Sequence, residues 1–380
     1  MLVGAGLALA LKGPPGSRIP YQGQTVEAWF GDLMKSDWNN PLSDVRTNLP
    51  AMAFLEMEGD AVPFLADRCA WGYAPFQRGY AIFLKKLPLK VRTKLPSPKP
   101  DPRGAALWLL GGIGHAQKTN AWQGTPSSKL SVQAAMPAIR KALQDPVLRS
   151  RACQTIGQIG VPASQAVPDL VRLAAADYAR KELDPGVIGA LGGIGSAASN
   201  AVPLLSAIAA DQAVRSRWLA VRALGDIGPS ARPAAPILGA LLAKQGAVND
   251  FALLTAVARI GGTPKEAVPP LQQVFARGNP LCQVMAAVAL WNFEPTNPEF
   301  QKNVSAFLQA SLEASGRVAH PASAEPLFLA GPLLATLRVH GTNAVVFAPV
   351  IRQLVQRGHP SLTNLAAITL QQLEPVTPVP

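Results

Sequence analysis

The chain has 380 residues, of which 48% are hydrophobic and 15% are charged, and its net charge is +12 at pH 7. This composition suits a folded protein and excludes an intrinsically disordered chain. The cysteines are far apart and form no CxxC motif, which excludes a disulfide framework and a cysteine-based metal site. We therefore expect reduced core residues at Cys69, Cys153 and Cys282.

The N-terminal segment begins with MLVGAGLALAL, which has the length of a signal-peptide core but lacks preceding basic residues. It is too short to span a bilayer. Two interpretations of residues 1–20 stay open: a truncated signal or anchor segment with a linker, or a frayed tail. The corresponding locations are the membrane or an exported state in the first case, and the cytoplasm in the second.

The next predicted elements are a helix over 25–35 and a first hairpin containing EGDAVPFL, which ends at Leu65. An irregular insertion is expected at 70–101, and it carries a basic cluster. A basic cluster suits nucleic acid or an anionic membrane surface, although a solvated loop is the interpretation we favour. The candidate interaction patch consists of Lys85, Lys86, Lys90, Arg92 and Lys94.

A repeated motif organises the rest of the chain. Its anchor glycines are spaced 35, 33 and 33 residues apart, and each is followed eight residues later by a proline. The glycines are Gly160, Gly195, Gly228 and Gly261, and the prolines are Pro168, Pro203, Pro236 and Pro269. Weaker copies lie around Gly114, Glu294, Gly341 and Glu374, with a second insertion at 117–130 after Gly114. A fixed period of this size is typical of stacked repeats.

Each repeat predicts two helices. Apolar residues recur eight, four and one positions before the glycine, as at Ala220, Leu224 and Ile227, and this spacing lines one face of a helix. The glycine ends that helix in a left-handed conformation, and the proline occupies the first turn of the next one. Small residues three positions before the glycine, such as Gly192 and Gly225, predict close approach of neighbouring helices.

The predicted fold is all-α: a single α-solenoid of about eight antiparallel helical hairpins over 21–375, ending in a helix at 362–373 and a tail at 376–380. The seventh repeat has Glu294 and Lys302 in place of the glycine and the proline, and the eighth has Arg338 where small residues usually stand. Drift in a tolerant repeat explains these departures, and a bend, cap or local binding surface is the alternative.

These hairpins, with LGxIG followed by AVPxL, resemble HEAT repeats of the shorter HEAT-like, phycobilisome-lyase type. The segment YQGQTVEAWFGDL at 21–33 is similar to the opening of HEAT-repeat proteins of planctomycete and verrucomicrobial bacteria. In those proteins an anchor or signal segment often precedes this opening. The resemblance implies a bacterial protein with a helical repeat fold, and it specifies function weakly.

Motifs for catalysis are missing from the sequence. The four histidines, His115, His320, His340 and His359, are dispersed and none is followed by glutamate, unlike the paired His-Glu iron ligands of HEAT-repeat hydroxylases. There is no HExxH, no zinc-type Cys/His spacing and no GxSxG. We therefore assign no catalytic, cofactor-binding or metal-binding residue, and expect a protein that is not an enzyme and needs no cofactor.

The predicted function is a non-catalytic scaffold that binds a protein partner on its curved helical surface. The alternatives are a HEAT-like enzyme of the bilin-lyase type, or a nucleic-acid-binding protein with a basic concave face. Nucleic acid is disfavoured because Asp169, Gln273 and Gln353 interrupt the basic positions of the second helices, which are Arg172, Lys244, Arg277 and Arg352. Among the tryptophans, Trp71 and Trp122 are candidates for exposed contact residues, although sealing of the ends of the repeat array is the role we favour.

Overall fold

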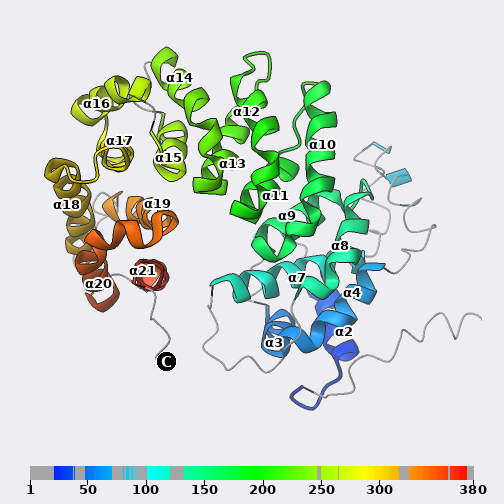
Figure 1. The fold of residues 1–380 in the computed structure, drawn as a ribbon. Helices are drawn as coiled ribbons and strands as arrows, with labels where there is room; N and C mark the ends of the chain where they lie inside the picture. The colour runs from blue at the N-terminus through cyan, green and yellow to red at the C-terminus, as the bar shows by residue number, and fades with distance from the viewer. Residues whose placement is uncertain are drawn as a thin grey trace, which may run out of the picture. The chain divides into compact units, whose positions relative to one another are not determined.

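A computed structural model describes residues 21–36, 38, 48–70, 80, 83–84, 87–88, 91, 101–119, 132–245, 250–263, 265–315, 325–357 and 360–374. Over these residues the chain is all-helical, as predicted (Figure 1). The described part has no strand, and its sole β-type pairing is an isolated bridge between Tyr21 and Gln24. The chain divides into two compact units, Met1–Asp169 and Leu170–Pro380, and each is considered by itself.

In the first unit α4 packs on both α7 and α8, and α7 packs along α9. Phe30 on α2 meets the rings of Phe54 and Phe64 edge-on, which places aromatic side chains in the core between α2, α3 and α4. Thr25 caps α2 by accepting a hydrogen bond from the Ala28 N–H at 3.3 Å, so the helix predicted at 25–35 is confirmed. The helices are α2 (Val26–Lys35), α3 (Leu49–Met57), α4 (Val62–Ala70), α7 (Pro102–Thr119), α8 (Met136–Leu143) and α9 (Arg149–Ile159), and α10 (Val167–Ala179) leads out of the unit.

In the second unit the first helices of successive repeats lie side by side: α11 packs on α13, α13 on α15, and α15 on α17 (Figure 1). Further along, α19 packs on α21 and also reaches α15. The first helices are α11 (Pro185–Ile194), α13 (Trp218–Ile227), α15 (Phe251–Ile260), α17 (Pro280–Phe293), α19 (Glu325–His340) and α21 (Pro360–Leu373). The second helices are α12 (Val202–Ala210), α14 (Ala235–Gln245), α16 (Val268–Arg277), α18 (Pro298–Ser315) and α20 (Ala348–Arg357).

The anchor glycines end the first helices, as predicted. Gly195 caps α11 with φ 75° and ψ −140°, and Gly160, Gly228 and Gly261 also have positive φ. The ψ value places Gly195 outside the left-handed helical region and in a region that is open almost only to glycine. The conformation therefore requires glycine even more strongly than the predicted one.

Each joint continues through a short 3₁₀ segment into the second helix. Pro168, Pro203, Pro236 and Pro269 are each the second residue of α10, α12, α14 or α16. At this position the missing N–H has no partner to lose. The predicted role of these prolines is confirmed.

The small residues before the anchors lie where neighbouring first helices touch. A Cβ atom on Gly225 would lie 2.8 Å from Ala256 Cα, and one on Gly192 would lie 3.2 Å from Ala223 Cα. Real Cβ atoms essentially never approach a neighbouring atom to 2.8 Å. The predicted close helix approach is confirmed.

Two details of the repeat alignment were wrong. Gly114 does not end a helix, because α7 continues to Thr119; its position instead lets Ile159 come close. No proline follows Gly114 at the spacing seen in the other repeats, so the chain lacks the signal that starts a second helix. In the seventh repeat α18 starts at Pro298, four residues before Lys302, whereas α17 ends at Phe293 and Glu294 caps it with a negative φ, in agreement with its anchor position.

The remaining boundaries follow from neighbouring helices. The 70–101 segment begins where α4 ends, at Ala70, and α7 starts at Pro102. The 117–130 segment overlaps the last residues of α7, and a 3₁₀ segment begins at Val132. The terminal helix predicted at 362–373 is confirmed as α21, and the segments 1–20 and 376–380 lie outside the described residues.

Candidate functional site

The predicted basic patch, Lys85, Lys86, Lys90, Arg92 and Lys94, lies outside the described residues, as do Trp71, Trp122, His320 and His359. Two stretches, Pro185–Ala210 and Ala330–Arg357, are long and apolar enough to cross a bilayer by length and composition alone. Each of them includes two helices of one hairpin with the 3₁₀ segment between them, and half of the first is buried in the protein. They are weak evidence for a membrane span.

The cysteines are all buried thiols. Burial raises the pKa of Cys69 to about 12 and also raises the pKa of Cys282, so neither forms a nucleophilic thiolate near neutral pH. Within the described residues no group of three or more His, Cys, Asp or Glu side chains could hold a metal ion.

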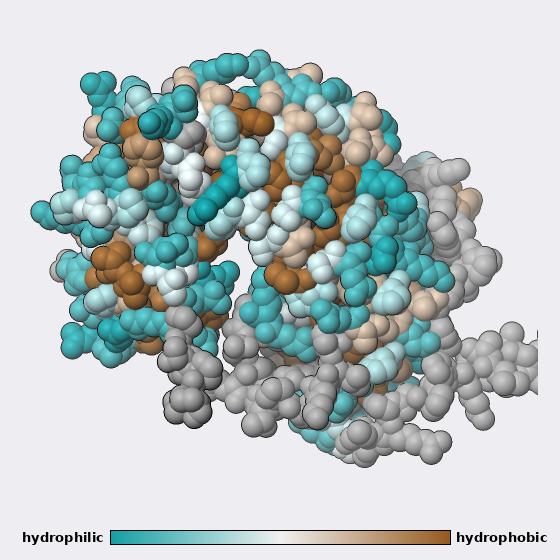
Figure 2. Space-filling view, in the orientation of Figure 1, coloured by the Kyte–Doolittle hydropathy of each residue, from teal (hydrophilic) through white to brown (hydrophobic). Residues whose placement is uncertain are grey.

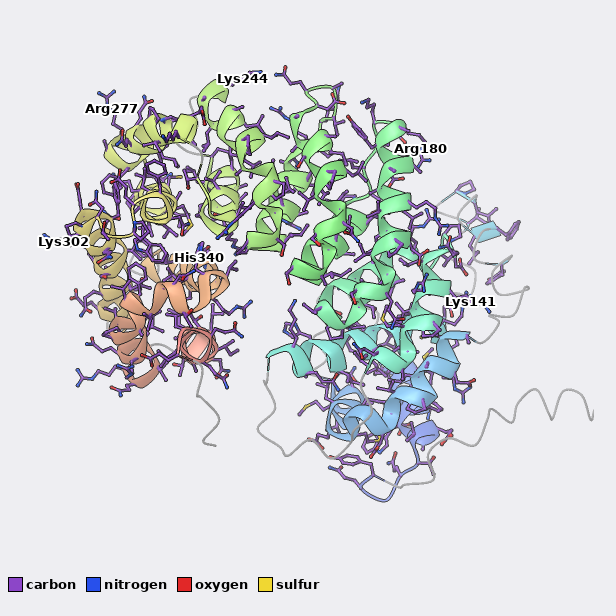
Figure 3. All side chains as sticks on the ribbon, viewed as in Figure 1. Lys141, Arg180, Lys244, Arg277, Lys302 and His340 are labelled. Atoms are coloured by element: carbon purple, nitrogen blue, oxygen red, sulfur yellow. The ribbon has the colours of Figure 1, made fainter. Side chains whose placement is uncertain are left out.

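The basic residues of the second helices do not form one stripe. Lys244 and Arg277 lie in the last turns of α14 and α16, where a cation interacts favourably with the helix dipole (Figure 3). Arg352 is paired with the Glu374 carboxylate at 2.8 Å. Figure 2 shows hydrophilic residues at the outer ends of α14 and α16. Apolar residues interrupt this hydrophilic surface further inward. The pairing of Arg352 with Glu374 and the interrupted hydrophilic surface fit a mixed surface better than a continuous cationic one.

Trp218 is the tryptophan that stands out in the structure. Its exposed fraction is 52%, whereas Trp29, Trp38, Trp108 and Trp291 are 8% exposed or less. It is the first residue of α13, at the end of the loop that joins α12 to α13. Tryptophan is among the residue types most enriched at the energetic centres of protein interfaces, so an exposed tryptophan is a candidate contact residue.

A shallow pocket of about 230 Å³ lies beside Trp218. Its apolar wall combines residues of four helices of the second unit: Ala209 of α12, Val221 of α13, Leu241 of α14, and Ala252 and Leu253 of α15. The volume is below the range of pockets that hold a cofactor or a drug-sized ligand, and it suits one inserted side chain.

The polar wall of the same pocket consists of Arg215, Arg217 and Asp250. Asp250 caps α15 by accepting a hydrogen bond from the Leu253 N–H at 3.1 Å, which occupies one of its oxygens. The Arg217 Nη1 atom is buried and has no hydrogen-bond partner in the part of the chain that the structure describes. The lining residues are therefore net positive, and one buried donor among them has no acceptor within the described residues.

The loop that carries Arg215 and Arg217 is held by Asp211. The Asp211 carboxylate accepts hydrogen bonds from the Ala213 N–H at 2.9 Å and the Tyr178 hydroxyl at 3.0 Å, and it is paired with Lys181. The hydrogen bond from Lys181 contributes most to lowering the pKa of Asp211. Lys181 also lies over the Tyr178 ring, 4.3 Å from its centroid. These contacts fix the start of the loop to the neighbouring repeat.

Outside the pocket, the Arg222 guanidinium lies 6.0 Å from the centroid of the Trp218 ring. Three arginines therefore surround one exposed tryptophan within eight residues, in the sequence RSRWLAVR at 215–222. Sequence analysis missed this site, although the signal was present. Because Phe251 fills the same repeat position in the next repeat, an aromatic residue there is not a departure, and the signal was the group of arginines around Trp218.

A second polar cluster surrounds His340 at the end of α19 (Figure 3). The ring donates a hydrogen bond from Nε2 to the Ala258 carbonyl oxygen at 2.7 Å, and Asn292 donates to the same oxygen at 2.9 Å. The His340 ring meets Trp291 edge-on at 5.9 Å. Burial lowers the pKa of His340, the hydrogen bond to Ala258 opposes this, and the charge of Arg232 lowers the pKa further. The ring is therefore a neutral structural group that ties α19 to α15.

This depressed pKa predicts a pH-dependent stability. The pKa of an unfolded histidine is about 6.5, so below that pH the unfolded chain binds more protons than the folded one, and stability falls as the pH is lowered. His340→Gln, which keeps an N–H donor, should lose less stability than the wild type between about pH 7 and about pH 5.5. Urea denaturation at the two pH values measures this, and an unchanged difference would contradict the role given to His340.

Comparisons with known proteins add little. No family model matches the chain, and none of the curated protein sequences matches it. A crystal structure of an engineered protein from the Northeast Structural Genomics Consortium aligns over 97% of this chain and 98% of its own, with 17% sequence identity and a TM-score of 0.38. A similarity at this level supports no argument about function.

Proposed function

We propose that the chain is a HEAT-like α-solenoid that acts as a non-catalytic scaffold and binds a protein partner at Trp218. The observation that supports binding is the exposed Trp218 side chain beside a small pocket and three arginines. Tryptophan and arginine are the residues most enriched among those that dominate the energy of protein interfaces. The solenoid is supported by the succession of α11, α13, α15 and α17, each packed on the next.

In such a fold the repeats supply rigidity, and surface residues supply specificity. Trp218 is the first residue of α13, and α13 packs against both α11 and α15. The backbone at Trp218 is therefore held in place. The preceding loop is tied down through Asp211. A partner would therefore meet a site that needs little ordering on binding, which reduces the entropic cost of association.

Protein binding is preferred to the two alternatives. A bilin-lyase type of enzyme needs a pocket for a tetrapyrrole, and the pocket beside Trp218 has about 230 Å³. A nucleic-acid-binding face needs successive aromatic platforms along a basic groove. Trp218 has arginine neighbours, but Tyr178, at the end of α10, is engaged by Lys181 and Asp211.

Affinity capture from lysate of the source cells tests the proposal. Immobilised wild-type protein is compared with Trp218→Ala and with Val345→Ala, which removes another exposed apolar side chain of the second unit. We expect a partner that the wild type and Val345→Ala retain in equal amounts and that Trp218→Ala loses by at least tenfold. Equal recovery by all three proteins, or recovery of nucleic acid alone, would contradict protein binding at Trp218.

A further inference from the structure

We infer that the Trp218 pocket accepts an acidic side chain of a partner protein, with the carboxylate bound by Arg217. This inference rests on the proposed scaffold function and assigns the chemistry of what enters the pocket. It starts from Arg217, which lines the pocket and whose buried Nη1 atom has no acceptor in the described part of the chain. A buried guanidinium N–H without an acceptor is unfavourable in the free protein, and a carboxylate in the pocket would satisfy it once the Arg217 side chain turns towards the pocket.

The charges around the pocket select an anion. Arg215 and Arg217 contribute two positive charges, and the single carboxylate, Asp250, is already bonded to the Leu253 N–H. The guanidinium of arginine presents parallel N–H donors that match both oxygens of a carboxylate. An uncharged amide of the same shape has a single acceptor oxygen, so it can accept from Arg217 at one position only and should bind more weakly.

The remaining walls select a small acid with an apolar stem. Val221, Leu241 and Leu253 provide an apolar floor, and the Trp218 ring stands half exposed at the edge. The methylene groups of a glutamate can lie on these side chains while its carboxylate reaches Arg217. A nucleotide is excluded by size, because the pocket has about 230 Å³ and suits one side chain.

The test uses blocked pentapeptides with a central glutamate between leucines, the same peptide with glutamine, and inorganic phosphate as probes. The protein is labelled with 5-fluorotryptophan, and the Trp218 resonance is assigned by its loss in Trp218→Phe. We expect the glutamate peptide to shift this ¹⁹F resonance saturably, with at least tenfold higher affinity than the glutamine peptide. Circular dichroism checks that each variant is folded.

Two variants separate Arg217 from general positive charge. Arg217→Gln should abolish the preference for glutamate, whereas Arg277→Gln, which removes a charge in the last turn of α16 and outside the pocket lining, should retain it. Equal affinity for the two peptides, no saturable shift at millimolar concentration, phosphate binding as tightly as the glutamate peptide, or a preference that survives Arg217→Gln would each overturn the inference. If Trp218→Ala loses a captured partner and Arg217→Gln keeps it, the scaffold function is supported. That result contradicts only the binding of a carboxylate by Arg217.

Discussion

Replacing Gly225 with leucine is expected to lower the free energy of unfolding by about 3 kcal/mol, at the upper end of what overpacking costs. Gly225 lies on α13 where it faces α15, and its missing Cβ would lie 2.8 Å from Ala256 Cα and 3.1 Å from Ala256 Cβ. The nearest atom belongs to the backbone of a helix, so no side-chain rotation can relieve the contact. The two helices would have to separate along their length.

The matched control is Gly189→Ala on α11. The nearest atom to a Cβ there is Arg222 Nη2 at 3.9 Å, the end of a flexible side chain. Without a packing conflict, alanine should raise the free energy of unfolding by up to about 1 kcal/mol, because it has the higher helix propensity. Urea denaturation followed by circular dichroism measures both variants. A Gly225→Leu protein as stable as the wild type would contradict the close packing of α13 and α15.

The sequence predicted the helix ends at which a glycine and a following proline occur together. A glycine that ends a helix with positive φ and a proline in the next first turn leave a readable pair, so the joints at Gly160, Gly195, Gly228 and Gly261 were predicted. Alignment failed where only half of that pair was present. Gly114 has no following proline and lies inside α7, where it serves packing against Ile159. Glycine alone does not distinguish a helix end from a close contact.

The candidate site was harder to predict because it depends on exposure. The apolar neighbours of Trp218 come from four helices, and the sequence gives no measure of how much of a tryptophan they cover. The other four described tryptophans are buried, and Trp218 is the departure, whereas Trp71 and Trp122 lie outside the described residues. Likewise, the unsatisfied Nη1 of Arg217 depends on where the loop at 211–217 places a guanidinium. The repeated motif predicts the order of the helices, whereas the exposure of a residue that departs from the motif is known only from the structure.

The second large effect on stability is expected at Phe347. This side chain is fully buried in the 3₁₀ segment between α19 and α20, and its ring meets Trp291 at 5.3 Å. Phe347→Ala should cost about 3 to 5 kcal/mol of local packing energy. The solenoid proposed above would have each repeat stabilised by its neighbours, so the cost should then appear as opening of the last hairpins and not as unfolding of the whole unit.

Native-state hydrogen exchange resolved by helix distinguishes these outcomes. In Phe347→Ala the amides of α20 and α21 should lose protection by a factor of about 100 or more, which is the rate equivalent of 3 kcal/mol, while those of α11 keep wild-type exchange. Phe54→Ala removes an equally buried ring from the first unit and should leave α20 and α21 unchanged. Uniform loss of protection from α11 to α21 would mean that the second unit unfolds as one block, and it would contradict the proposed solenoid, in which stability passes mainly between neighbouring hairpins.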